Sequence, residues 1–81
     1  MARYFFELHN GSGVTRDEEG REFPNKDEAR REAVVGIRSV LGAEVASGSI
    51  DLDGRMDVLN EDGEILFTIP FSDAVTVNQS K

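Results

Sequence analysis

Apolar side chains recur with a helical period in one long segment of the chain, residues 25–48. At about 100° per residue they fall on one side of a helix; they are Ala29, Ala33, Ile37, Val40 and Leu41, with Val34 and Val45 near the edge. Asn25 stands where an N-cap belongs, and Glu28 follows three residues later, as in a capping box. Gly48 is the residue type that commonly ends a helix. The pattern predicts one long helix that covers a core.

Before this helix the period changes to that of a strand. Residues 3–9 are rich in β-forming side chains, and residues 10–13 (Asn-Gly-Ser-Gly) have the composition of a hairpin turn that leads into a return strand at residues 14–16. Residues 17–20 make a further turn, and residues 21–23 extend toward the helix cap. On the first strand we expect Tyr4, Phe6 and Leu8 on one face and Phe5, Glu7 and His9 on the other.

A second hairpin is predicted after the helix. Residues 55–59 form its first strand, with Met56 and Val58 facing inward, and residues 60–63 form its turn. On the strand at residues 64–71 we expect Ile65, Phe67, Ile69 and Phe71 to face the helix and Leu66 and Thr68 to face away. The fold class is therefore α+β in the order ββαββ: two β-hairpins in one antiparallel sheet, with a single long helix packed across one face.

A chain of 81 residues has the length of one domain. The predicted elements end near residue 72, so we assign residues 1–72 to a single α+β domain. Residues 73–81 have no anchoring pattern beyond two valines, and we expect a disordered C-terminal tail there.

Composition and charge exclude several classes of function. The net charge of −7 is unsuited to a protein that binds the phosphate backbone of nucleic acids, which needs a basic face. The chain has no cysteine, so disulfides, thiolate metal sites and cysteine nucleophiles are excluded. It also has no apolar run near 18 residues and no signal-peptide pattern, so we expect no membrane span and a cytoplasmic location.

Three motifs that resemble chemical sites are interpreted as structural. The Gly-Ser-Gly at residues 11–13 lies between two strands, whereas a phosphate-binding loop leads into a helix. The Asp-x-Asp-Gly at residues 51–54 has its glycine too early for a calcium loop. His9 has no accompanying triad-like spacing, and we expect it to be a solvent-facing strand residue. We therefore assign no catalytic residue, no metal ligand and no cofactor.

The outer face of the sheet is the candidate functional surface. A single helix covers only one face, so apolar side chains on the other face meet water or another chain. The partner-binding residues predicted on it are Phe5, His9, Leu66 and Thr68. We expect a small non-enzymatic protein-interaction or regulatory module that binds a protein partner or forms a weak homodimer through this face. The alternative is a small enzyme or a weak divalent-cation-binding protein that uses the acidic turns at residues 51–54 and 61–64.

These segments together resemble a family of short uncharacterised bacterial proteins, a domain of unknown function. The matching stretches span nearly the whole chain; they are residues 3–6 (Arg-Tyr-Phe-Phe), 10–11, 17–22, 29–33, 51–54 and 61–71. The resemblance implies the fold and a single domain, and it implies no activity. Residues 17–33 have a looser similarity to antitoxins of the HicB type, which bears only on the kind of partner.

Overall fold

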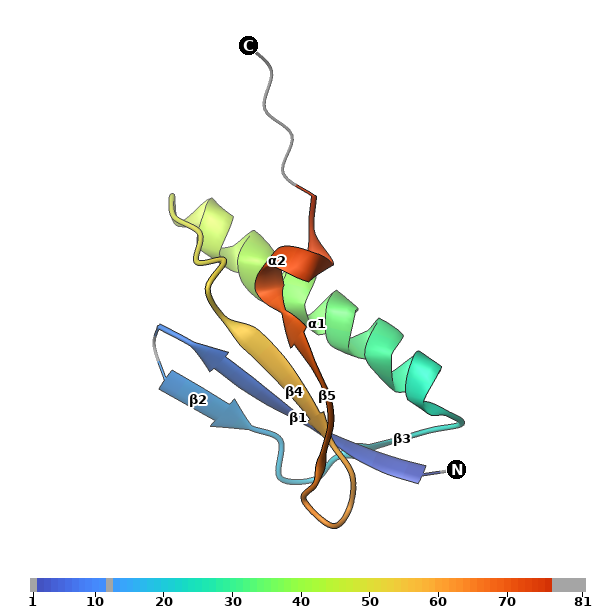
Figure 1. The fold of residues 1–81 in the computed structure, drawn as a ribbon. Helices are drawn as coiled ribbons and strands as arrows, with labels where there is room; N and C mark the ends of the chain where they lie inside the picture. The colour runs from blue at the N-terminus through green and yellow to red at the C-terminus, as the bar shows by residue number, and fades with distance from the viewer. Residues whose placement is uncertain (1, 12, 77–81) are drawn as a thin grey trace.

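The computed structural model describes residues 2–11 and 13–76 and has the predicted α+β architecture. In chain order the elements are β1 (Ala2–Asn10), β2 (Gly13–Arg16), β3 (Arg21–Phe23), α1 (Lys26–Ala46), β4 (Arg55–Leu59), β5 (Ile65–Pro70) and α2 (Phe71–Ala74). The strands form one antiparallel sheet in the order β2-β1-β4-β5, and β3 also pairs with β1. Figure 1 shows α1 lying across one face of the sheet, with α2 beside it. Both predicted hairpins, β1–β2 and β4–β5, are present.

Helix α1 begins and ends where the sequence predicted. The Oδ1 atom of Asn25 accepts a hydrogen bond from the Glu28 amide at 2.9 Å, which satisfies one of the unpaired amides of the first turn. At the other end the amides of Gly48 and Ser49 donate to the carbonyls of Val45 and Glu44, a Schellman motif. The buried face consists of Ala29, Ala33, Ile37 and Leu41, all of them predicted. No helix in the described ranges is long and apolar enough to cross a membrane.

Strand β1 is the centre of the sheet because it pairs with three other strands. Its first residues pair with β3 and its last with β2, while β4 runs along its other side. The β3 pairing was not predicted, since residues 21–23 were expected only to lead into the helix. As predicted, Tyr4 is buried and Phe6 and Leu8 pack against the core on the helix side. The intervening side chains, among them Phe5, therefore face away from the helix.

The predicted alternation along β5 is wrong at its start, because the strand contains a bulge. Val58 pairs with Phe67, but Leu59 pairs with Ile65, so Leu66 is an extra residue on β5. A bulge reverses the facing of the residues that precede it. Leu66, expected on the outer face, packs against the core, and Ile65, expected inside, is 58% exposed. Thr68 faces outward as predicted.

The C-terminal tail was predicted to begin too early. Phe71 was expected at the end of a strand but begins the short helix α2, and its side chain is completely buried. The Nε atom of Arg38 donates to the carbonyl of Ala74 at 2.7 Å, and Ala74 is also buried. Residues 73–75 therefore belong to the packed domain. Residue 76 is exposed and has no regular structure, and residues 77–81 lie outside the described residues.

We predict that Phe71→Ala destabilises the protein by about 3–5 kcal/mol, because it removes the largest fully buried side chain and leaves a cavity. Urea unfolding followed by circular dichroism measures this loss. Ile65→Ala is the control and should cost about 0.5 kcal/mol or less, because Ile65 is on the surface. Equal losses at the two positions would show that α2 is not part of the core.

Two glycine substitutions should have opposite effects. A Cβ atom at Gly54 would collide with the ring of Phe71 and lie 2.7 Å from the carbonyl oxygen of His9. We expect Gly54→Ala to cost about 1–3 kcal/mol through overpacking. A Cβ atom at Gly42, inside α1, would meet nothing within 4 Å, so Gly42→Ala should stabilise the protein by up to about 1 kcal/mol. The two unfolding midpoints in urea, compared with wild type, check both signs.

Candidate functional site: the outer face of the sheet

Pairing between strands arranges the outer face in rows. One row is apolar and contains Phe5, Leu59 and Ile65, which pair across β1, β4 and β5; we call it the apolar row. The next row is polar and runs from β2 to β5 through Arg16, Glu7, Asp57 and Thr68. His9 and Arg55 pair beside it. The face thus has an apolar end and a polar middle.

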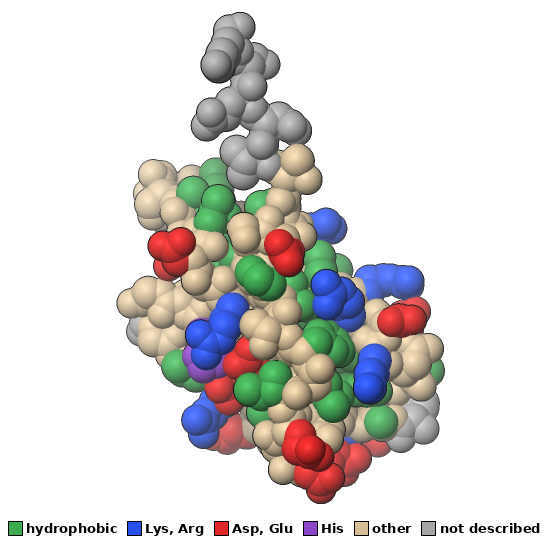
Figure 2. Space-filling model, viewed as in Figure 1, with side chains coloured by type: hydrophobic (Ala, Val, Ile, Leu, Met, Phe, Trp, Pro, Cys, Tyr) green, Lys and Arg blue, Asp and Glu red, His purple; other side chains and the backbone are tan. Residues whose placement is uncertain are grey.

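Glu7, His9 and Asp57 form a compact group in the polar middle, which we call the polar cluster. The Nε2 atom of His9 lies 2.7 Å from Oε1 of Glu7 and 3.3 Å from Oδ2 of Asp57. Asp57 is only 3% exposed, although its side chain lies on the outer face of the sheet. Figure 2 shows the single histidine among basic and acidic side chains on this side of the molecule.

Three further side chains hold the carboxylates of the polar cluster from outside. The Nε atom of Arg16 is 3.3 Å from Oε2 of Glu7. Thr68 donates its hydroxyl to Oδ1 of Asp57 at 2.8 Å, and Nε of Arg55 is 3.5 Å from the same oxygen. Each carboxylate therefore uses one oxygen for an outer partner and directs the other toward His9. The two guanidinium groups offset the two carboxylate charges.

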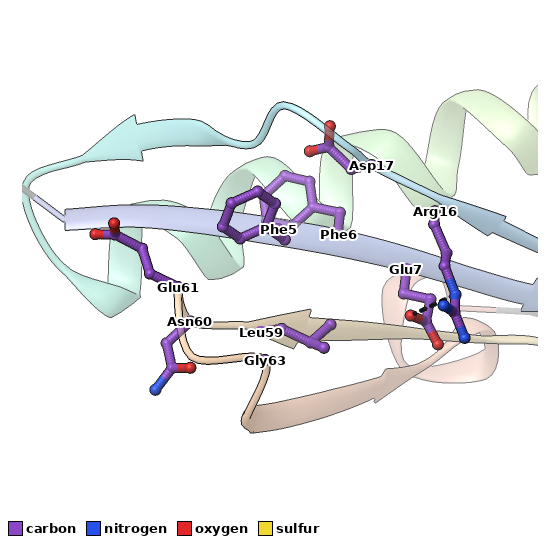
Figure 3. Close-up of a pocket in the computed structure, with 9 residues that line it drawn as sticks. All are labelled: Phe5, Phe6, Glu7, Arg16, Asp17, Leu59, Asn60, Glu61 and Gly63. Carbon is purple, nitrogen blue, oxygen red and sulfur yellow. Dashed lines mark ion pairs between the residues drawn. The ribbon is translucent and has the colours of Figure 1, made fainter.

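A hollow of about 230 Å³ lies beside the apolar row. Phe5 and Leu59 line it, together with Asn60, Glu61 and Gly63 of the β4–β5 turn and with Glu7, Arg16 and Asp17. Figure 3 shows the Glu7–Arg16 ion pair at one end of the hollow and the turn residues at the other. The hollow has an apolar floor between polar ends.

Acidic turns flank this hollow on two sides. The turn at residues 17–20 packs against Phe5, because a Cβ atom at Gly20 would lie 2.8 Å from its ring. That turn carries Asp17, Glu18 and Glu19, and the β4–β5 turn on the other side carries Glu61 and Asp62. Acidic side chains gather at this end of the molecule in Figure 2. The apolar floor is therefore rimmed by negative charge.

Of the four predicted site residues, the structure places Phe5, His9 and Thr68 on the outer face and Leu66 on the helix side. His9 was expected to face solvent, but its side chain is only 19% exposed because two carboxylates enclose it. Sequence analysis did not predict Asp57 as a site residue. The alternation of the strand does indicate its position, because Asp57 lies between the inward-facing Met56 and Val58 and must therefore face outward. Sequence analysis also missed Ile65, because a bulge has no clear sequence signal.

The two acidic turns of the alternative prediction, residues 51–54 and 61–64, are stabilised by hydrogen bonds to the backbone. Both carboxylate oxygens of Asp51 accept backbone hydrogen bonds, Oδ2 from the Gly11 amide and Oδ1 from the Asp53 amide. In the β4–β5 turn, Oδ1 of Asn60 accepts from the amides of Asp62 and Glu64. Across residues 2–11 and 13–76, the one group of three side chains spaced to hold a metal ion is the polar cluster.

Comparison with known protein families gives one result. The family described as "Domain of unknown function (DUF6894)" matches residues 3–72. The chain belongs to this family. Membership agrees with the predicted resemblance to an uncharacterised family, whereas the similarity to HicB-type antitoxins has no counterpart among the matches. No curated protein and no solved structure matches the chain significantly.

We predict that Asp57→Ala destabilises the protein by about 1–3 kcal/mol, because it removes the acceptor of the Thr68 hydroxyl and a partner of His9. Thermal and urea unfolding measure this loss. The matched control is Asp62→Ala in the exposed β4–β5 turn, which should change stability by about 0.5 kcal/mol or less. A loss at Asp57 no larger than that of the control would contradict a structural role for the polar cluster.

Proposed function

We propose that this protein is a small, non-enzymatic interaction module that binds a partner protein through the outer face of its sheet. The observation that supports it is the apolar row. Ile65 is 58% exposed and continues the row of Phe5 and Leu59 beside the hollow. Exposed apolar side chains that are contiguous and rimmed by polar residues are typical of interaction sites.

The charge around the hollow favours a basic partner. Acidic side chains of the 17–20 turn and the β4–β5 turn flank the apolar floor, and the whole chain has a net charge of −7. Complementary charge speeds association and excludes wrong partners. We infer that the ligand is a segment with an apolar anchor residue between lysines or arginines.

A second copy of the chain fits this face less well. In a two-fold dimer each patch meets the same patch of its partner, so acidic rims would face acidic rims in either orientation. The apolar row is also short: burying one exposed isoleucine contributes about 1.5–3 kcal/mol, against an association cost of about 4–15 kcal/mol. A weak homodimer therefore needs more favourable contacts than this row supplies.

Nucleic acid is a poor candidate for the partner because the arginines of α1 already have partners within the domain. Arg31 pairs with Glu28, Arg38 donates to the carbonyl of Ala74, and Arg30 lies 5.6 Å from the centre of the Phe67 ring. Few of these guanidinium groups are available for phosphate contacts.

We further propose a cytoplasmic location for the module.

The alternative of a small enzyme or a weak cation-binding protein that uses the acidic turns has less support. The Asp51 carboxylate already accepts two backbone hydrogen bonds, and Asn60 organises the β4–β5 turn through its own backbone. These contacts give both turns a structural role.

We predict that a short peptide with a central leucine between lysines and arginines binds wild type, and that Ile65→Ser weakens binding about tenfold, the equivalent of ~1.4 kcal/mol. Amide chemical shifts of ¹⁵N-labelled protein should move along the apolar row and in the β4–β5 turn. Added salt should weaken binding, because the rim charges are exposed. The matched control is Val35→Ser, which removes a valine of similar exposure (51%) on the far side of α1.

Two further peptides define the specificity. Replacing the basic residues by Asp and Glu, or the central leucine by serine, should remove the shifts. An acidic peptide that binds as well as the basic one would contradict the charge assignment. Sedimentation that shows a wild-type dimer, lost in Ile65→Ser and kept in Val35→Ser, would assign the face to a second copy instead.

A further inference from the structure

We propose that Glu7, His9 and Asp57 form a binding site for a divalent transition-metal ion such as Zn²⁺. The site goes beyond the interaction function and depends on residues other than the apolar row. One imidazole nitrogen and two carboxylate oxygens are offered, and these three atoms lie within 4.8 Å of one another. Imidazole and carboxylate together are a common donor set for such ions.

The distances within the polar cluster fit ligands around one ion. Zinc binds nitrogen and oxygen at about 2.0–2.2 Å, which places neighbouring ligand atoms about 3.0–3.5 Å apart. The Nε2 atom of His9 is already 2.7 Å from Glu7 and 3.3 Å from Asp57. Small rotations of the Glu7 side chain bring the first separation into that range. The ion would lie between the Nε2 atom of His9 and the two carboxylate oxygens.

Neighbouring side chains orient the two carboxylate ligands, as they do in known metal sites. The oxygen of Asp57 that turns away from His9 accepts from Thr68 at 2.8 Å, and the distal oxygen of Glu7 is 3.3 Å from Arg16. Such partners around a metal site fix the direction of each ligand. Because these contacts hold one oxygen of each carboxylate, the other oxygen remains directed at the imidazole.

The backbone also prepares the site. Glu7 and Asp57 are directly paired residues on β1 and β4, and His9 is two residues further along β1 on the same face. Ligands on paired strands hold their spacing better than ligands on loops. Asp57 is 3% exposed, so one ligand is already withdrawn from water.

The charges around the site set the expected affinity and the kind of ion. Arg16 and Arg55 partly offset the two carboxylates, so we expect micromolar rather than nanomolar binding. A nitrogen ligand disfavours Mg²⁺ and Ca²⁺, which prefer oxygen alone. Nη2 of Arg55 lies 3.4 Å from Nδ1 of His9. When Nε2 of His9 binds the ion, Nδ1 carries the ring proton and can no longer accept from Arg55. The Arg55 side chain must then turn away, which its 52% exposure allows.

The test uses the full chain without a histidine tag. Titration calorimetry with Zn²⁺ should show saturable one-to-one binding to wild type. Paramagnetic Co²⁺ should broaden the amide signals around Glu7, His9 and Asp57 before those of either acidic turn, and this localises the ion on wild type alone. Mg²⁺ at the same concentrations should bind at least about tenfold more weakly.

Variants then separate ligands from positioning residues. His9→Gln and Asp57→Asn should abolish Zn²⁺ binding, and Thr68→Val should weaken it about tenfold. Asp73→Asn, which removes an exposed carboxylate from α2, should leave binding unchanged. A folded wild type that shows no saturable binding at millimolar Zn²⁺, Co²⁺ broadening centred on an acidic turn, or undiminished binding in a folded His9→Gln protein would each overturn the site. None of these results bears on peptide binding by the apolar row.

Discussion

Pairing of β1 on both of its sides is the interaction on which the rest of the structure depends. β3 and β2 pair along one side of this strand and β4 along the other. Its side chains alternate between the two faces, so one nine-residue strand supplies both the aromatic side chains under α1 and the residues of the outer face. A shift of register by one residue would exchange the two sets.

Pairing of β1 with β4 also places charged side chains close together on the outer face, where Asp57 is buried. On the helix side, α1 and α2 exclude water from Val58 and Ile69, which are completely buried. On the other side no helix within the described part of the chain covers Asp57, and the surrounding side chains of β1, β4 and β5 enclose it. Withdrawing a carboxylate from water costs several kcal/mol, and close partners repay this cost only where their geometry is excellent. Removing Asp57 alone leaves its partners unpaired, whereas well-packed apolar residues in place of the whole polar cluster would stabilise a small domain more simply. The polar cluster is therefore better explained by binding than by stability.

The polar cluster and the apolar row both contain residues of strand β1. Glu7 pairs with His9 in the polar cluster and lines the hollow beside Phe5. An ion at the polar cluster would therefore lie next to the surface where a basic partner is proposed to bind. The two proposals concern adjoining parts of one face, and they are physically separable because Ile65 takes no part in the polar cluster.

The sequence by itself determined the elements whose stabilising contacts are local. The ends of α1 depend on hydrogen bonds within five residues of Asn25 and of Gly48, and both hairpins follow from turn residues and alternating strands. Membership of a family without a known function was also predictable from sequence. The fold class, the helix face and the outward position of Phe5 followed from the same periodicities.

Only the tertiary structure decided which residues meet across strands. The extra residue Leu66 arises from how β5 pairs with β4, and it exchanges the expected positions of Ile65 and Leu66. Asp57 is 48 residues from His9 in the chain, so no local pattern could place its carboxylate 3.3 Å from the imidazole. Phe71 leaves the strand to begin α2 because the space beside Gly54 and α1 accepts its ring. A local pattern predicts which face of the sheet each side chain of a single strand lies on. Register and burial, in contrast, depend on how the strands pair in the assembled sheet.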